Sequence, residues 1–298
     1  MVYKKMNAEL SKSLNAIGLK AKNASAILNT ATSAQKNKFF DLAIAAIQEN
    51  AEEILAANQI DIKAAKDNGK DDAFIDRLAL DKSRLQGICN TLIEIKSFED
   101  PVGRELASWQ RPNGLNISRV ATPLGVIGLI FESRPNVAAD AGGLCLKSGN
   151  AVILRSGKDG LRSASAIVRS LQNALINADL PKECIQIVPF ESRDAATMML
   201  EGLNSSIDVI VPRGGKSLVA EVEKSAKVPV FGHLEGICHI YVDESSDPEA
   251  ASKIVTNAKL RRTSICGAVE TLLVDQKALK SHSKEIIKSL IKSGCEVR

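Results

Sequence analysis

The chain has 298 residues, of which 45% are hydrophobic, 25% are charged and 3% are aromatic. This composition is that of a soluble globular protein and excludes the collagen, coiled-coil and disordered classes. No apolar run approaches the roughly 20 residues that a membrane-spanning helix needs, so we expect no membrane partner. The net charge of +4 comes from scattered basic residues, and few aromatic rings are available for base stacking. We therefore expect no nucleic-acid partner.

The chain has six cysteines, which form no C-x-x-C pair and are too widely spread for the disulfide framework of a small scaffold. Free thiols are typical of a reducing, intracellular compartment. The first twenty residues lack the continuous apolar stretch and the cleavage site of a secretion signal. We therefore expect a cytoplasmic protein.

The first hundred residues have the apolar spacing of amphipathic helices. Ser33 is the predicted N-cap of a helix whose apolar stripe continues through Ile54 and Leu55. Asp81 is the predicted N-cap of another helix, and residues 67–69 (Asp-Asn-Gly) predict a turn between the two. We interpret these stripes as core packing.

Between residues 116 and 231 the pattern changes to strands that alternate with helices. The predicted strands are 116–121, 126–131, 151–155, 185–188, 207–211 and 228–231. The predicted helices are 137–146, 161–180, 193–201 and 216–226. Alternation at this spacing is typical of βαβ crossovers. The sequence therefore predicts an α/β fold with a doubly wound parallel sheet.

Ligands of such a sheet bind at the carboxyl ends of its strands. Those ends are followed here by residues 131–134 (Phe-Glu-Ser-Arg), 155–158 (Arg-Ser-Gly-Lys) and 212–215 (Pro-Arg-Gly-Gly). Arginine beside small residues suits phosphates and carboxylates. A P-loop is excluded, because the glycine that the motif requires at position 210 is an isoleucine. For the Gly214-Gly215 turn two interpretations stay open, an anion site at a helix start and a tight turn only.

A second α/β segment begins near Gly236. Its predicted elements are a strand at 237–242, a helix at 248–259, a strand at 269–274, a helix at 283–291 and the start of a further strand at 295–298. The spacing of His233, Cys238 and His239 matches no common zinc pattern, so we predict no metal there and interpret these residues as packed side chains. About 60 residues is near the lower limit for a stable domain, so we expect an incomplete domain in a C-terminally truncated chain.

Cys266 is the candidate nucleophile. It follows Arg261 and Arg262 and precedes the predicted strand 269–274. Nearby arginines favour the thiolate, which is the reactive form. Ser264 and Gly267 are small and leave room for a substrate. The alternative is a buried, inert thiol, which we assign to Cys89, Cys145, Cys184 and Cys295.

Several segments together resemble the gamma-glutamyl phosphate reductase family, which belongs to the aldehyde dehydrogenase superfamily. These segments are 123–128, 132–137, 147–155, 211–215, 238–243 and 257–274, in order along nearly the whole chain. The resemblance implies a Rossmann-like cofactor domain at 1–235, with a flap-like segment near 100–120, and the start of a catalytic domain at 236–298. Two positions depart from the family pattern, Thr263 in place of proline and Gly267 in place of asparagine.

The resemblance implies NADPH-dependent reduction of L-glutamyl 5-phosphate to L-glutamate 5-semialdehyde and phosphate, in proline biosynthesis. Cys266 is then the catalytic residue, which forms a thioester with the substrate, a small-molecule acyl phosphate. The implied cofactor-binding residues are Arg155, Ser156, Lys158, Pro212, Gly214 and Gly215. The candidate substrate-binding residues are Arg134, Asn136 and Arg262, and for the two arginines a solvated or structural role stays open. The resemblance also implies a homo-oligomer for full-length members, and leaves the oligomeric state of this chain open.

Two alternatives stay open, another dehydrogenase of the same fold and a non-catalytic fragment. If the catalytic domain is incomplete, we expect weak NADPH binding and poor turnover.

Overall fold

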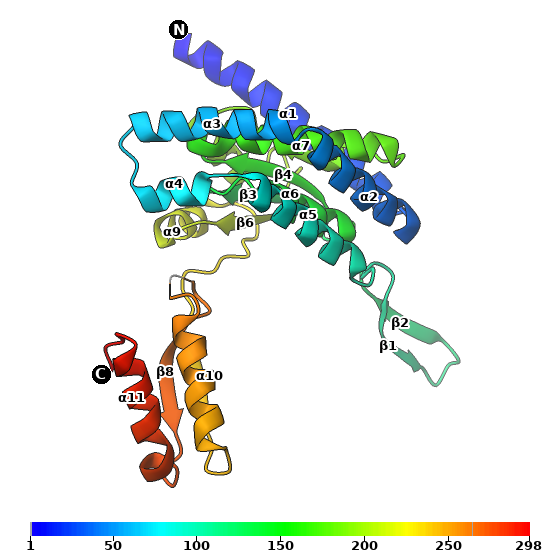
Figure 1. Cartoon of the computed structure of the whole chain (residues 1–298). Coiled ribbons are helices and arrows are strands. Elements are labelled where there is room, and N and C mark those ends of the chain that lie inside the picture. The colour runs from blue at the N-terminus through cyan, green and yellow to red at the C-terminus, as the bar shows by residue number, and fades with distance from the viewer. Residues whose placement is uncertain (1, 264) are drawn as a thin grey trace. The chain divides into compact units, whose positions relative to one another are not determined.

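The chain divides into two compact units, Met1–Gly232 and His233–Arg298. This computed structural model describes residues 2–263 and 265–298, with side chains from residue 8 onward. Figure 1 shows the elements of each unit. Within these residues, no helix has both the length and the apolar character that crossing a membrane requires.

The N-terminal unit begins with five helices. They are α1 (Val2–Leu28), α2 (Ser33–Glu49), α3 (Ala51–Asp67), α4 (Asp72–Leu78) and α5 (Lys82–Ser97). The prediction that Ser33 caps α2 is wrong, because Thr32 and Gln35 form a reciprocal capping box at this helix start. The predicted continuous stripe through Ile54 crosses a break, since Asn50 leaves the helical conformation and caps α2. The cap at Asp81 is confirmed, with its Oδ1 accepting from the Arg84 N–H at 2.7 Å.

Four parallel strands form the sheet of this unit. In spatial order they are β5 (Ile185–Ile187), β4 (Ala151–Ser156), β3 (Val126–Phe131) and β6 (Val209–Arg213). All three strand pairings are parallel, and β3 and β4 are buried along nearly their whole length. The doubly wound parallel sheet is therefore confirmed, since the apolar runs that predicted it are covered on both faces.

Helices cover both faces of this sheet (Figure 1). One core joins α2, α5, α6 (Val137–Lys147) and α7 (Leu161–Asn177) to one face of the strands. The other core joins α1, α8 (Arg193–Leu200) and α9 (Lys216–Ser225) to the opposite face. Alternate residues of β4 separate the two cores, with Val152 in the first and Ile153 in the second. The α7 helix ends earlier than predicted, before Asp179, whose φ of 58° lies in the left-handed region.

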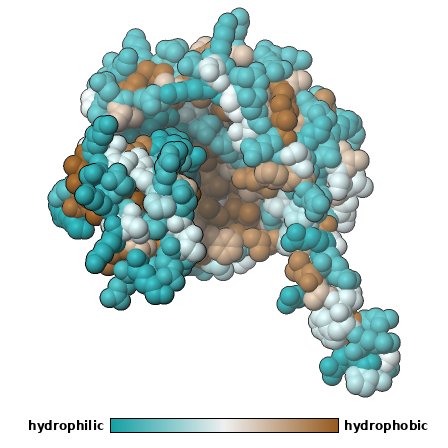
Figure 2. All heavy atoms as spheres, turned by 60° about the horizontal axis from the view of Figure 1, so that its bottom comes forward, coloured by the Kyte–Doolittle hydropathy of each residue, from teal (hydrophilic) through white to brown (hydrophobic). Residues whose placement is uncertain are grey.

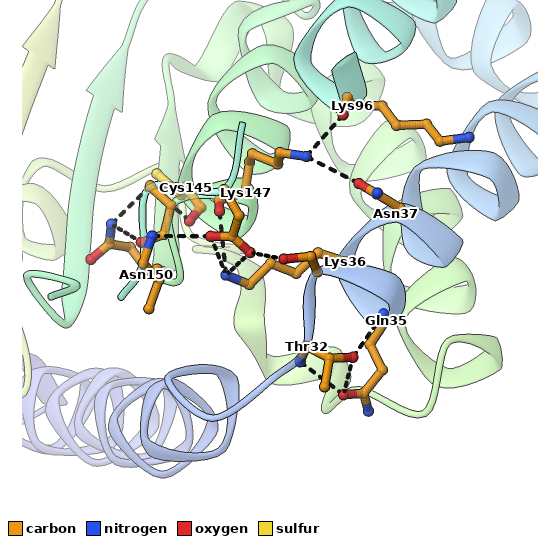
Figure 3. Close-up of polar contacts among 12 residues, drawn as sticks. Thr32, Gln35, Lys36, Asn37, Lys96, Cys145, Lys147 and Asn150 are labelled. Atoms are coloured by element: carbon orange, nitrogen blue, oxygen red, sulfur yellow. Dashed lines mark hydrogen bonds and ion pairs between the residues drawn. The ribbon is translucent and has the colours of Figure 1, made fainter. Parts of the chain in front are cut away.

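A buried polar network joins α2, α6 and the chain after α5 (Figure 3). Lys36 is 1% exposed, and its Nζ lies 2.9 Å from the Asp100 Oδ2. Lys147 Nζ donates to Asn37 Oδ1 at 3.0 Å and to the Lys96 carbonyl at 2.8 Å. Two buried ammonium groups are therefore held by one carboxylate and by oxygen acceptors, which ties these elements together.

An antiparallel hairpin follows this network. It consists of β1 (Glu105–Gln110) and β2 (Asn116–Val120), which form a sheet of their own. The sequence predicted β2 and missed β1. Trp109 and Ile117 lie opposite each other in the ladder and are both exposed. Figure 2 shows this hairpin as an arm with hydrophobic and hydrophilic side chains on its surface.

The C-terminal unit is a small βαβα fold. Its elements are β7 (Cys238–Val242), α10 (Pro248–Leu260), β8 (Val269–Val274), a π-helical turn (Leu279–Ser283) and α11 (Lys284–Lys292). The two strands are parallel, and Val242, Val255 and Ile286 lie in the core that the helices cover. The predicted strand start at 295–298 is wrong. The backbone there caps α11 instead, with the Cys295 N–H donating to the Leu290 carbonyl after a left-handed Gly294.

Candidate active site

The carboxyl ends of β3, β4 and β6 bring charged side chains together, as their parallel order requires. Arg155 is the penultimate residue of β4, and its Nε is buried without a hydrogen-bond partner in the described chain. Burial lowers the pKa of the Arg155 guanidinium, the charge of Arg193 lowers it further, and Glu132 raises it. The end of β4 therefore holds a partly desolvated guanidinium, that of Arg155, with a donor that no other described group uses. Such a group suits an anionic ligand.

The Gly214-Gly215 turn joins β6 to α9 and holds a carboxylate. The Gly215 N–H donates to Glu132 Oε2 at 3.2 Å, so Glu132 sits at the N-terminus of α9. A Cβ at Gly214 would lie 2.7 Å from Glu132 Oε2 and 2.6 Å from Leu218 Cδ2. A side chain at 214 would therefore displace the Glu132 carboxylate and the end of Leu218, whereas a Cβ at 215 would meet nothing within 4 Å. The helix start binds an anion, and the anion in this structure is the chain's own Glu132.

Ser156 and Lys158 differ although both follow β4. Ser156 is 3% exposed, and its hydroxyl donates to the Gly157 carbonyl at 3.0 Å. Lys158 is exposed at the start of a short 3₁₀ turn, Lys158–Gly160. Of these two predicted residues, only Lys158 is charged, and its side chain is exposed to solvent.

The loop between β3 and α6 contains Arg134 and Asn136. It turns sharply at Ser133, whose φ of 40° is in the left-handed region. Asn136 Nδ2 donates to Asp140 Oδ2 at 2.8 Å. Burial raises the pKa of the Asp140 carboxyl, while this hydrogen bond and the charge of Arg213 oppose the rise. The structure therefore couples Asn136 to Asp140, which the sequence did not single out.

Cys266 lies in an exposed turn of the C-terminal unit, directly before β8. The Ala268 N–H donates to the Ile265 carbonyl at 3.1 Å, which places Cys266 and Gly267 at the corner of the turn. The chain entering β7 passes close by, because a Cβ at Gly236 would lie 2.8 Å from the Cys266 carbonyl oxygen. Arg262 is exposed after the end of α10. Ser264 lies outside the described residues.

Cys238 is the residue that the sequence missed here. Its thiol donates a hydrogen bond to the Cys266 carbonyl oxygen, which lies 3.2 Å from the Cys238 Sγ. The two cysteines are far apart in the sequence, and only the pairing of β7 with β8 brings them together. His239, which we expected to pack in the core or in a cleft, is not in the core, because its ring is exposed and contacts the Ile237 carbonyl through Nδ1.

The cysteines of the N-terminal unit have the surroundings of inert thiols. Burial raises the pKa of Cys145 to about 12, and burial with the charge of Glu183 does the same for Cys184. Burial also raises the pKa of Cys89. A thiol with so high a pKa has almost no thiolate at neutral pH, so reactivity is confined to other cysteines. Among the described residues, no cluster of three or more His, Cys, Asp or Glu side chains has a metal-binding arrangement.

Comparison with known proteins identifies the class first. Residues 2–294 match the aldehyde dehydrogenase family. An acetylating aldehyde dehydrogenase of Geobacillus thermoglucosidasius has the same fold, with a TM-score of 0.62 at 18% identity over 95% of this chain and 59% of that chain. The α/β unit with its doubly wound sheet is therefore that of an aldehyde dehydrogenase, in a family of oxidoreductases.

More similar relatives narrow the family. The gamma-glutamyl phosphate reductase of Brucella suis is 53% identical over 293 residues, which are 98% of this chain and 70% of that protein. The enzyme of the same name from Allorhizobium ampelinum is 54% identical over 282 residues, or 95% of this chain and 66% of that protein. The crystal structure of the Thermotoga maritima gamma-glutamyl phosphate reductase has a TM-score of 0.87 at 37% identity, covering 94% of this chain and 68% of that chain. The chain belongs to the gamma-glutamyl phosphate reductase family.

Proposed function

We propose that this chain carries the cofactor-binding residues and the nucleophile of an NADPH-dependent reductase. The reaction converts L-glutamyl 5-phosphate to L-glutamate 5-semialdehyde and phosphate, as a cytoplasmic step of proline biosynthesis. The observation that carries the proposal is Cys266, an exposed thiol at the corner of a turn in a member of this family. The cysteines at 89, 145 and 184 are buried and have raised pKa values.

The Cys266 thiolate attacks the acyl carbon of the substrate, and the bond to the phosphate oxygen breaks. Phosphate leaves, and a glutamyl thioester remains on Cys266. No water has to be activated, because the leaving group departs as phosphate. Negative charge develops on the acyl oxygen, and backbone N–H groups of the turn around Cys266 stabilise it. Arg134, Asn136 and Arg262 are the proposed ligands of the substrate's phosphate and carboxylate groups.

NADPH, when bound, supplies the hydride that reduces the thioester. The end of β4 fits its phosphates, because Arg155 has a buried Nε without a partner and Lys158 is exposed beside it in the chain. Gly214 and Gly215 with Pro212 and Ser156 line the same ends of the strands. Glu132 is bound to the Gly215 N–H, so a phosphate at that N–H has to displace the Glu132 carboxylate.

The test of the whole proposal is NADPH oxidation by the purified chain with freshly generated gamma-glutamyl phosphate, or the phosphate-dependent reverse reaction. Slow turnover is expected in the wild type and is expected to vanish in Cys266→Ala. Undiminished turnover in that variant would exclude Cys266 as the nucleophile.

The cofactor preference has a separate test, in which NADPH and NADH are titrated against the chain. A cation that contacts the 2′-phosphate favours NADPH over NADH. Lys158→Ala should therefore lower NADPH affinity by about 10-fold, because one charged hydrogen bond is lost. NADH affinity should be unchanged, because NADH has no 2′-phosphate. Lys182→Ala is the matched control, because Lys182 is also exposed and starts a 3₁₀ turn, but before the amino end of β5. Equal losses for both cofactors in Lys158→Ala would refute the assignment.

We also propose that the hairpin β1–β2 contacts a second copy of the chain. Its Trp109 and Ile117 are exposed side by side on a two-stranded sheet, which is at best marginally stable alone. Sedimentation at increasing protein concentration tests this association, and a monomer at every concentration would contradict it.

A further inference from the structure

We propose that Cys238 is a resolving thiol for Cys266, so that mild oxidation of Cys266 ends in a reversible Cys238–Cys266 disulfide. The proposal rests on the reactivity of Cys266 that the proposed function requires. It adds a modification site and assigns a role to a second cysteine of the C-terminal unit.

The first argument is distance. The Cys238 Sγ lies 3.2 Å from the Cys266 carbonyl oxygen. The Cα of a residue is about 2.4 Å from its own carbonyl oxygen, so the Cys266 Cα lies within about 5.6 Å of this sulfur. The contact places the Cys238 sulfur against the backbone of Cys266, and the disulfide requires the exposed turn that carries Cys266 to move until the two sulfurs meet.

The second argument is the backbone that carries the two cysteines. Cys238 is opposite Val269 in the parallel ladder, and the register shifts immediately after it, where His239 is opposite Thr271. Such an irregularity loosens the ladder at this end of the sheet and re-aims the neighbouring side chains. Cys266 is in an exposed turn, and Cys238 is partly exposed. An oxidant can therefore reach Cys266, and the neighbouring Cys238 thiol can then attack the oxidised Cys266 sulfur.

The third argument is that the other cysteines are unsuited to this role. Cys295 belongs to the same unit but packs against its core with Ile240 and Leu272, and its backbone caps α11. Cys89, Cys145 and Cys184 are buried in the N-terminal unit. Cys238 is thus the thiol that the fold places beside Cys266.

The chemistry balances with a hydroperoxide as oxidant. The Cys266 thiolate attacks one oxygen of hydrogen peroxide, the O–O bond breaks, hydroxide leaves and takes up a proton to form water, and the sulfur becomes a sulfenic acid. The Cys238 thiolate then attacks the Cys266 sulfur, the S–O bond breaks, and hydroxide leaves and takes up a proton to form water. Two thiol groups of a reductant return both cysteines by exchange. The disulfide blocks the nucleophile and protects it from irreversible sulfinic acid formation.

The experiment uses the purified chain, hydrogen peroxide, iodoacetamide under denaturing conditions and trypsin. Trypsin releases each cysteine of this unit on its own peptide, 228–253 for Cys238, 263–277 for Cys266 and 293–298 for Cys295. The expected product is peptide 228–253 linked to peptide 263–277, separable by dithiothreitol. Cys295→Ser should leave this link unchanged. Cys238→Ser and Cys238→Ala should abolish it and convert Cys266 to the sulfinic acid, with a sulfenate that dimedone traps for several-fold longer.

The outcomes separate this inference from the proposed function. If peroxide leaves Cys266 of the native chain unmodified, the reactive nucleophile is missing and both fail. If Cys266 is oxidised to sulfinic acid at the same rate in wild type and Cys238→Ser, with no linked peptide, the resolving role of Cys238 is wrong and the nucleophile stands. A link through Cys295 or between two chains would also overturn the assignment.

Discussion

Cys145 in the N-terminal unit and Cys266 in the C-terminal unit bear the same thiol in opposite surroundings. Cys145 is on α6, between helices and a sheet covered on both faces, where burial raises its pKa to about 12. Cys266 is exposed in a turn beside a two-stranded sheet whose core consists of few buried side chains. The depth of the surrounding core therefore decides whether a cysteine is a buried packing residue or an accessible thiol.

The same contrast extends to polar groups. In the N-terminal unit, Lys36 and Asp61 are buried and bound to polar partners. Loss of a partner therefore leaves a charge or a donor in the interior without water or an acceptor. In the C-terminal unit, the carboxylate of Asp247 caps a helix at the surface. Replacing a carboxylate should therefore cost most in the first unit and least in the second, which the predictions below test in that order.

The largest effect is expected for Asp100→Ala, which leaves the 1% exposed Lys36 without its carboxylate. Removal of one partner of a buried pair costs about 3–5 kcal/mol of unfolding free energy. Burial raises the pKa of Asp100, but hydrogen bonds from Lys36, Val102 and Ser33 outweigh it and leave the pKa lowered. The stability from this shift is present above the unfolded value of about 3.9 and is lost as pH falls through the folded pKa.

Denaturant unfolding at pH 7 and below pH 4 measures both parts of this prediction. The wild type should lose stability toward acid more steeply than Asp100→Ala. Parallel acid profiles of the two proteins would show that Asp100 is not the carboxylate responsible.

Asp61→Ala is the next largest. Asp61 is on α3 and is 0% exposed, and its Oδ2 accepts from both the backbone N–H and the hydroxyl of Ser163, at 2.8 and 2.6 Å. Because Ser163 is in the first turn of α7, the variant leaves buried donors without a partner and should cost about 3 kcal/mol. Native-state hydrogen exchange of the β3 and β4 amides reports on this unit alone. A loss under about 1 kcal/mol would mean that water replaces the carboxylate.

Gly236→Ala tests whether the chain entering β7 shapes the Cys266 turn. Its Cβ would lie 2.8 Å from the Cys266 carbonyl oxygen, so the turn has to shift and the Cys238 contact should be lost. We expect the iodoacetamide rate at Cys266 to change by about 10-fold, equivalent to about 1.4 kcal/mol. Gly267→Ala is the control, because its Cβ would meet nothing nearer than Ile265 Cδ1 at 3.9 Å. Similar rates in the two variants would exclude this shaping role.

Asp247→Ala should have the smallest effect. Asp247 Oδ1 accepts from the Ala250 N–H at 2.7 Å as the exposed N-cap of α10. Loss of such a cap costs about 1 kcal/mol, since water can replace the acceptor. Hydrogen exchange of the β7 and β8 amides should show the loss, and a loss as large as that of Asp61→Ala would remove the distinction between the units.

The sequence predicted the parallel sheet well because its strands are buried on both faces. The continuous apolar run 126–131 gives β3 its full length, and 151–155 gives all of β4 except Ser156. It failed where a few capping hydrogen bonds decide the outcome. Thr32 and Gln35 form the cap of α2 that was assigned to Ser33, and Cys295 caps α11 where the start of a strand at 295–298 was predicted.

The candidate site shows the same division. The loops after β3, β4 and β6 were predicted to lie where ligands bind, because ligands of a parallel sheet bind at the carboxyl ends of its strands. Two contacts could not be predicted in this way, the hydrogen bond from the Gly215 N–H to Glu132 and the contact of Cys238 with Cys266. Both depend on side-chain geometry between residues far apart in the sequence. A Cys at the start of one strand and a Cys just before its parallel neighbour was the one signal in the sequence for the second contact.

The most direct test of the account is trapping of the acyl group on Cys266. The chain is mixed with freshly generated gamma-glutamyl phosphate without NADPH, quenched in acid and digested with trypsin. The account predicts a glutamyl group on peptide 263–277 and release of an equivalent amount of phosphate, with neither in Cys266→Ala. A glutamyl group on peptide 228–253, or undiminished phosphate release in Cys266→Ala, would contradict the assignment of Cys266 as the nucleophile.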